Sequence, residues 1–132
     1  MRHDLADRVL KEGPEFVAQA MPARLFSPRT LAEQPDIVEA TQNVIRANRS
    51  ESVAGGSRAL ADREDVVSRL HQVSVRTLLI VGTEDVISTV GEMHAMAAAI
   101  PNSQLVEIPG AGHMAPLESP ALVNQAILHW WN

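Results

Sequence analysis

Two short segments of this sequence carry the residue types that acid–base catalysis requires. Asp85 ends the segment Gly82-Thr83-Glu84-Asp85, and His113 ends the segment Gly110-Ala111-Gly112-His113. An aspartate that accepts the Nδ1–H of a histidine fixes the tautomer of the ring and stabilises the imidazolium, which leaves Nε2 free as a general base. We therefore take Asp85 and His113 as a candidate acid–histidine pair.

Each of the two segments follows an apolar run that is typical of a strand. Residues 75–81 (VRTLLIV) are rich in β-branched residues and leucine and lead into Gly82, which suits a strand buried on both faces. Residues 104–108 (QLVEI) lead into Pro109-Gly110 and predict a second strand. Both candidate residues therefore lie just beyond the carboxyl end of a predicted strand.

A helix between the two strands would make them parallel. Apolar residues recur at helical spacing over residues 92–100 and stop at Pro101. A strand, a helix and a strand in this order predict a parallel βαβ unit with a right-handed crossover. Functional groups of a parallel sheet gather at the carboxyl ends of its strands, so Asp85 and His113 are predicted to meet there.

The other parts of the chain favour helices. A last helix is predicted after Ser119-Pro120, and residues 37–45 carry one apolar stripe that predicts a buried helix face. Asp62 is expected to cap another helix, whose apolar face would include Val66, Val67 and Leu70. The fold class expected is α/β, with residues 1–74 as an all-helical segment and residues 75–132 as a parallel βαβα unit.

Composition limits the classes of function. The 132 residues carry a formal net charge of −5 and four aromatic side chains, so neither a basic surface nor an aromatic platform for nucleic acid is expected. The sequence has no cysteine, which excludes disulfides, thiolate zinc sites and cysteine nucleophiles. No apolar run is long enough to span a bilayer and no signal peptide is visible, so a cytoplasmic protein without membrane contact is expected. The adjacent Trp130 and Trp131 are expected to be covered, because their apolar area is large.

Simpler roles exist for the same residues. Glu84 or Asp85 could serve only as a turn or helix-cap residue, and His113 could be a solvated side chain of a glycine-rich loop. A metal site built from His94, His113 and Asp85 would fit no recurring ligand spacing, so no metal and no cofactor is expected. The order of an acid and then a histidine after consecutive strands favours the catalytic interpretation.

These motifs resemble the C-terminal part of the α/β-hydrolase family. In that family a strand that ends in G-x-x-D, here Gly82 to Asp85, carries the acid of a catalytic triad. A G-x-G-H segment, here Gly110 to His113 followed by Pro116-Leu117-Glu118-Ser119-Pro120, carries the histidine. Residues 1–74 are similar to the helical cap that precedes the acid-bearing strand, and Ala59 to Asp65 resemble a stretch of the esterase and lactonase branch. The resemblance implies the C-terminal half of an α/β-hydrolase fold with Asp85 and His113 as catalytic residues.

The nucleophile motif of that family does not occur in the sequence. The nearest string to a G-x-S-x-G elbow is Gly55-Gly56-Ser57-Arg58-Ala59, which has no strand before it, so Ser57 is interpreted as a small packing residue of a helix. The resemblance therefore implies a serine hydrolase of small carboxylic esters or lactones whose nucleophile half lies outside this chain, which would be inactive alone. Two alternatives stay open: a non-catalytic half-domain that self-associates, and a family member with other chemistry such as dehalogenation.

The expected sheet predicts self-association. The family places the strand at residues 76–82 inside a larger sheet, so one edge of that strand would have no partner within this chain. A two-stranded sheet is marginally stable by itself. We therefore expect a homodimer through the open sheet edge, and no nucleic acid or membrane partner.

Overall fold

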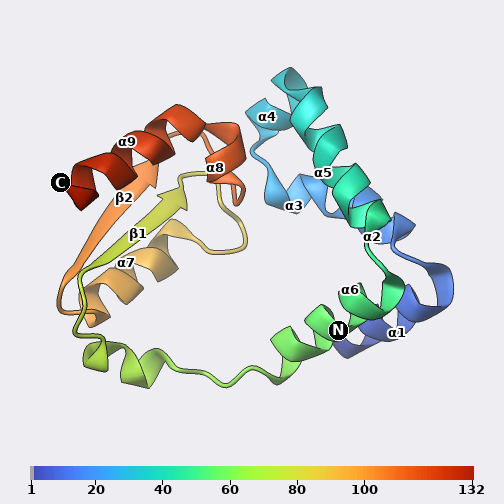
Figure 1. The fold of residues 1–132 in the computed structure, drawn as a ribbon, viewed down its shortest axis with the longest axis horizontal. Helices are drawn as coiled ribbons and strands as arrows, with labels where there is room; N and C mark the ends of the chain where they lie inside the picture. The colour runs from blue at the N-terminus through green and yellow to red at the C-terminus, as the bar shows by residue number, and fades with distance from the viewer. Residues whose placement is uncertain (1) are drawn as a thin grey trace. The chain divides into compact units, whose positions relative to one another are not determined.

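The computed structural model describes residues 2–132 as a mainly helical chain with two strands (Figure 1). These residues form two compact units, one of residues 2–22 and 36–65 and the other of residues 23–35 and 66–132. No helix within residues 2–132 is long and apolar enough to cross a membrane. The elements in chain order are α1 (Arg2–Glu12), α2 (Glu15–Ala20), α3 (Pro22–Leu25), α4 (Pro28–Glu33), α5 (Pro35–Ala47), α6 (Ser50–Asp62), η1 (Val67–Gln72), β1 (Thr77–Gly82), α7 (Val90–Ala99), β2 (Ser103–Ile108), α8 (Ala115–Glu118) and α9 (Pro120–Trp131).

Residues 23–35 belong with the strands, although they fall inside the helical segment expected for residues 1–74. The division of the chain at residue 74 into a cap and a core stays a prediction. This short stretch matters for the site, because it contains α4 and the residues that precede it.

The first unit is built on the packing of α1 against α6. Ala6 and Val9 on α1 and Ala54 on α6 are buried between these helices. Ser57 is also buried in α6, and its hydroxyl donates a 2.8 Å hydrogen bond to the carbonyl oxygen of Arg2. Ser57 is therefore a packing residue, as the sequence predicted.

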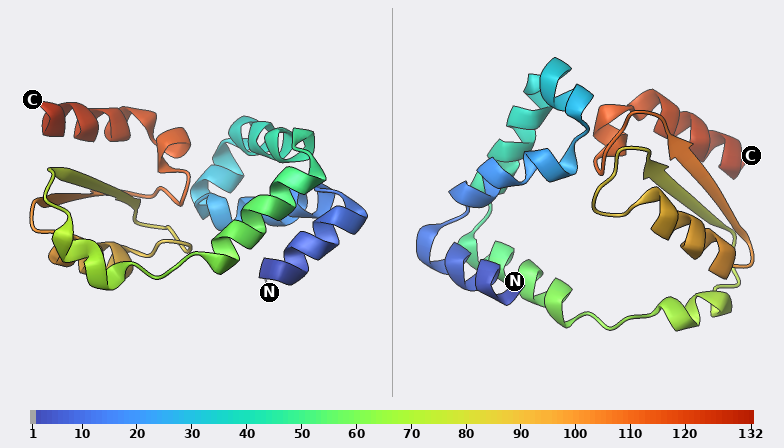
Figure 2. Two further views of the ribbon diagram at one scale, coloured as in Figure 1. Left: turned by 60° about the horizontal axis from the view of Figure 1, so that its bottom comes forward. Right: turned by 180° about the vertical axis from the view of Figure 1, so that it is seen from behind.

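The second unit contains the predicted βαβα arrangement. β1 and β2 are parallel, with Thr77 opposite Ser103 and Gly82 opposite Ile108. α7 connects them, and α7 and α9 lie on opposite faces of the sheet (Figures 1 and 2). The core of this unit consists of four buried residues with two partly buried ones packed against them: Ile108, Ala111, Ala115 and Val123, with Ile80 and Val106.

The carboxyl end of β1 lies directly against the backbone of the loop that follows β2. A Cβ atom at Gly82 would overlap the carbonyl oxygens of Ala111 and Gly112. The amide of Glu84 donates a 2.9 Å hydrogen bond to the Ala111 carbonyl oxygen. The two loops are thus in backbone contact, which only a glycine at position 82 permits.

The helix expected after Asp62 does not form. Asp62 is instead the last residue of α6, and a short 3₁₀ helix, η1, begins at Val67. The side chains expected to form its buried face are exposed, Val66 by 46% and Val67 by 63%. Residues 63–66 are non-helical, and residues 67–72 adopt the 3₁₀ form instead of the predicted α-helix.

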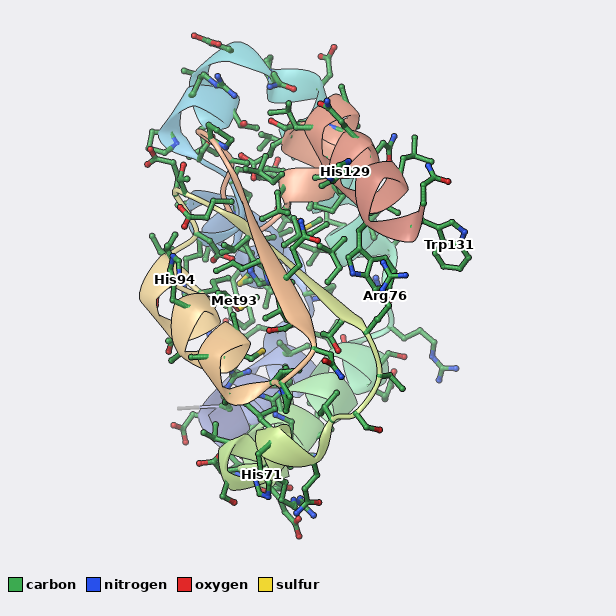
Figure 3. All side chains as sticks on the ribbon, turned by 90° about the vertical axis from the view of Figure 1, so that its left-hand side faces the viewer. His71, Arg76, Met93, His94, His129 and Trp131 are labelled. Carbon is green, nitrogen blue, oxygen red and sulfur yellow. The ribbon has the colours of Figure 1, made fainter. Side chains whose placement is uncertain are left out.

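Three surfaces that were expected to be buried are not. α5 forms as predicted, but none of its residues is buried and Val44 is 63% exposed. β1 is only partly buried apart from Val81 and Gly82. Trp131 is 74% exposed and projects outward at the end of α9 (Figure 3). The described part of the chain does not supply the apolar area that would cover these side chains.

Replacement of Gly82 by alanine is expected to destabilise the second unit by on the order of 1–3 kcal/mol, because the methyl group would overlap two backbone oxygens. Gly91→Ala is the matched control, since a Cβ at Gly91, in α7, would meet nothing within 4 Å. Urea unfolding followed by circular dichroism measures both variants. An unchanged midpoint for Gly82→Ala would contradict the backbone contact at the end of β1.

Candidate active site

Asp85 and His113 meet at the carboxyl ends of the two strands, as the strand order predicts. Oδ2 of Asp85 lies 2.9 Å from Nδ1 of His113. The side chain of Asp85 is only 6% exposed, whereas that of His113 is 35% exposed. The acid is therefore buried behind a ring that remains accessible to solvent, and the catalytic role of the pair stays a prediction.

The second carboxylate oxygen of Asp85 has a different task. Oδ1 accepts hydrogen bonds from the amides of Ile87 at 2.7 Å and Ser88 at 2.9 Å. Asp85 therefore has the turn contacts that the simpler interpretation expected, in addition to its contact with His113. One oxygen fixes the loop after β1, and the loop in turn aims the other oxygen at His113.

These contacts favour the ionised form of Asp85. Burial raises the pKa of its carboxyl group, but the Ser88 amide, the His113 ring and the Ile87 amide stabilise the charged form more. The pKa of Asp85 consequently lies below its ordinary value. An ionised carboxylate can only accept hydrogen bonds. Nδ1 of His113 therefore carries the hydrogen that it donates to Asp85, and Nε2 is left as the basic nitrogen.

A buried glutamate holds the loop that carries His113. Oε1 of Glu118 accepts a 2.8 Å hydrogen bond from the Gly112 amide, and Oε2 accepts one of 2.8 Å from the Ser27 amide. Glu118 is only 5% exposed. A Cβ at Gly112 would lie 2.8 Å from the backbone nitrogen of Ser27, so the two segments are in direct contact.

Sequence reasoning gave Glu118 and Ser27 no role in the site. Glu118 occurs in a motif that marked the family resemblance, but nothing in its local pattern distinguishes it from an exposed helical glutamate. The only sequence signal was the glycine before His113, because a required glycine indicates close approach of another segment.

A cleft of about 360 Å³ adjoins the acid–histidine pair. Its polar side chains are Asp85, Ser88 and His113, and apolar side chains from β1, α7, α8 and α9 form most of its wall. A reacting group in this cleft would be close to the imidazole and largely surrounded by apolar side chains. The apolar residues that line it include Ile80, Met93, Val123 and Ile127.

The other histidines do not join the pair. His94, on α7, is exposed (Figure 3), and its Nε2 lies 2.8 Å from Oε1 of Glu107 on β2. His71 on η1 and His129 on α9 are exposed. Within residues 2–132 no three His, Asp or Glu side chains are grouped as metal ligands would be. The weak alternative of a metal site with His94, His113 and Asp85 thus has no geometric support.

Comparison with known proteins identifies relatives over almost the whole chain. The sequence model of the alpha/beta hydrolase family matches residues 1–126. The chain is 30% identical over 122 residues to 3-oxoadipate enol-lactonase 2 of Acinetobacter baylyi, an alignment that covers 92% of this chain. A thermophilic esterase from Thermogutta terrifontis is 42% identical, with a TM-score of 0.95 over 98% of this chain. An enol-lactonase from Burkholderia xenovorans LB400, 23% identical with a TM-score of 0.88 over 96% of this chain, shares the fold.

The chain spans about half the length of these relatives. It covers 45% of the Acinetobacter lactonase, 48% of the Thermogutta esterase and 48% of the Burkholderia lactonase. The predicted α/β fold, resembling the C-terminal half of an α/β-hydrolase, is therefore confirmed at the level of fold and family.

The lowered pKa of Asp85 predicts a loss of stability in acid. A carboxyl group whose pKa is lower in the folded state stabilises that state above its unfolded pKa, and the contribution is lost as the pH falls through the folded value. We expect Asp85→Asn to be less stable than wild type at neutral pH, with a difference that shrinks below about pH 4. Urea unfolding of both proteins between neutral and acidic pH measures the difference in their free energies of unfolding. The carboxyl groups that both proteins share contribute equally to the two values and cancel in that difference. A difference that stays constant down to acidic pH would contradict the lowered pKa.

Proposed function

This chain belongs to the alpha/beta hydrolase family, and we propose that it supplies the acid and the histidine of a serine hydrolase for carboxylic esters or lactones. The 2.9 Å contact between Asp85 Oδ2 and His113 Nδ1 carries the proposal. The names of an esterase at 42% identity and an enol-lactonase at 30% identity support the choice of substrate class.

In this proposal His113 moves the proton in both halves of the reaction. Nε2 takes the proton of a serine hydroxyl while the serine oxygen attacks the carbonyl carbon of the ester. The imidazolium, stabilised by Asp85 at Nδ1, then gives that proton to the leaving alkoxide oxygen, and an acyl-enzyme remains. A water molecule repeats the cycle, and the acid product and the free serine are released.

The serine of the proposed triad comes from outside these 132 residues. The sequence contains no G-x-S-x-G elbow, and Ser57 is packed inside α6. The cleft beside His113 gives a nucleophile a place to approach, because Asp85 and His113 line it together with an apolar wall. Ser88 lines the same cleft and is the serine of this chain that an activity of the isolated chain would require.

The test is a chimera. The part of the Thermogutta esterase that this chain matches, 48% of that protein, is replaced by this chain, so that the esterase contributes the rest of its sequence, where the proposal expects the nucleophile. We expect the chimera to hydrolyse a p-nitrophenyl ester, and His113→Ala or Asp85→Asn to lower kcat by about 10³-fold or more. His94→Ala, a histidine outside the cleft, is the matched control and should leave kcat unchanged.

The isolated chain provides the second arm of this test. We expect no ester hydrolysis above background, because a triad without its nucleophile loses nearly all of its rate enhancement. Turnover by the pure chain that disappears in both Ser88→Ala and His113→Ala would overturn the assignment of the nucleophile to another segment. A folded chimera that is as active with His113→Ala as without it would overturn the proposed role of His113.

We also propose that the chain on its own forms a homodimer. Among residues 2–132, β1 pairs only with β2, so its other edge presents unpaired backbone groups. Large apolar side chains of α9 are exposed in addition, including Leu122, Ile127 and Leu128. These surfaces support an interface larger than about 1,000 Å².

Light scattering after size-exclusion chromatography measures the mass of the isolated chain in solution. The expected result is twice the 14.3 kDa of one chain at micromolar concentration. A monomer of 14.3 kDa with a sharp thermal transition would contradict the homodimer and would leave the hydrolase proposal unaffected.

A further inference from the structure

We propose that Glu118 is a positioning residue, which holds His113 in reach of Asp85 by tying the histidine loop to residues 25–30. The inference rests on the proposed function, because it concerns the orientation of the histidine that would transfer the proton. Glu118 lines neither the cleft nor the acid–histidine contact, so its role is exerted through the backbone.

The carboxylate of Glu118 joins two distant parts of the chain. One oxygen accepts the amide of Gly112 and the other accepts the amide of Ser27, 91 residues earlier in the sequence, both at 2.8 Å. A buried carboxylate is costly unless its oxygens are hydrogen-bonded, and here each oxygen has a backbone donor. Loss of the carboxylate would leave both amides buried without this acceptor.

His113 is fixed from both sides by the same segment. Its preceding residue, Gly112, is held through Glu118, and the amide of its following residue, Met114, donates a 3.0 Å hydrogen bond to the carbonyl oxygen of Leu25. The position of the His113 Cα atom is therefore defined by residues 25–27. Only the side-chain torsions remain to set the direction of Nδ1.

The segment that binds Glu118 has side-chain hydrogen bonds of its own. Ser27 is the N-cap residue of α4, and its hydroxyl oxygen accepts the Thr30 amide at 3.2 Å. The same hydroxyl donates to Oγ1 of Thr30 at 3.1 Å, and both residues are buried. These two side-chain contacts hold Ser27, whose amide Glu118 accepts, at the start of α4.

A positioning role is distinguishable from a purely structural one by the tautomer of His113. The hydrogen bond to Asp85 keeps the hydrogen of the neutral ring on Nδ1. A shift of the loop by about 1 Å would break that bond, because N–H···O bonds weaken beyond about 3.2 Å. The hydrogen would then be free to move to Nε2, whereas a change in overall stability alone would leave the tautomer unaltered.

The experiment is long-range ¹H–¹⁵N NMR of the folded, labelled chain at alkaline pH, where an unperturbed imidazole is neutral. Wild type should show His113 with its hydrogen on Nδ1, and Asp85→Asn should lose this preference. Glu118→Ala should lose it as well. Glu118→Gln, which keeps one acceptor oxygen but sets an amide NH₂ against a backbone N–H, should show a reduced preference. Ser103→Ala is the control, because the Ser103 hydroxyl donates to the carbonyl oxygens of Ala97 and Ile100 at the end of β2 away from His113. It should lower the unfolding temperature while the tautomer stays as in wild type.

The outcomes separate the two proposals. A wild-type tautomer in both Glu118 variants, together with its loss in Asp85→Asn, would overturn the role of Glu118 and leave the acid–histidine pair intact. If Asp85→Asn also kept the wild-type tautomer, the pair itself would fail, and the proposed function with it. If Glu118→Ala does not fold, Glu118→Gln decides, because it preserves the size of the side chain. Loss of the tautomer in Ser103→Ala as well would mean that lowered stability alone changes it, which would reduce Glu118 to a structural residue and overturn the proposal.

Discussion

The parallel pairing of β1 with β2 places Gly82 opposite Ile108, and the geometry of the site depends on that register. Both strands end at the same level, so the loop that carries Asp85 and the loop that carries His113 begin side by side. A slip by one residue would move one loop by about 3.3 Å, which exceeds the tolerance of a hydrogen bond. The hydrogen bonds between the strands end at this point. Beyond them, the contact of Gly82 with the backbone of the loop that carries His113 fixes the distance between the two loops.

Two buried carboxylates hold the loops at the ends of these strands in place through their hydrogen bonds. Asp85 uses one oxygen for its own loop and the other for His113, and Glu118 uses one oxygen for the histidine loop and the other for Ser27. Hydrogen bonds to charged groups contribute roughly 1.5–3 kcal/mol each, so these contacts are strong enough to order short loops. No buried side-chain nitrogen or oxygen in the described part of the chain lacks a hydrogen-bond partner.

The sequence predicted those features that depend on local pattern. Apolar runs followed by glycine located β1 and β2, and the helical spacing of residues 92–100 located the crossover, so the meeting of Asp85 and His113 followed from topology. The contact between Ser27 and Glu118 was not predictable, because no periodicity relates positions 91 residues apart. The helix expected after Asp62 failed for a related reason, since apolar spacing indicates a face but does not show whether another surface covers it.

α5 and β1 both form, although neither is buried to the extent that the sequence predicted. The apolar stripe of residues 37–45 correctly predicted the helix α5 but wrongly predicted that this face of the helix is buried, since Val44 is 63% exposed. In β1 the ladder with β2 supplies hydrogen bonds that do not require both faces to be covered, so the strand forms although most of it is only half-buried. Local propensity and pairing therefore decide which elements exist, whereas burial depends on surfaces that the pattern of one segment cannot specify.

The contacts that orient His113 all lie within one compact unit. Its acid, its anchoring glutamate and the segment around Ser27 belong to residues 23–35 and 66–132. An acid–histidine pair must be held to within about 0.5 Å, which rigid elements of one unit can achieve without help from the nucleophile. The proposed serine has a weaker requirement, since it needs only to be delivered to the cleft beside the ring. A segment that carries the serine could pack against the apolar wall of that cleft, which includes Ile80 and Val123. Such packing would contribute about 25 cal/mol of stabilisation for each Å² of apolar surface buried. Under the proposed function, orientation of the base and supply of the nucleophile are thus physically separable tasks, and the contacts within residues 23–35 and 66–132 serve the first of them.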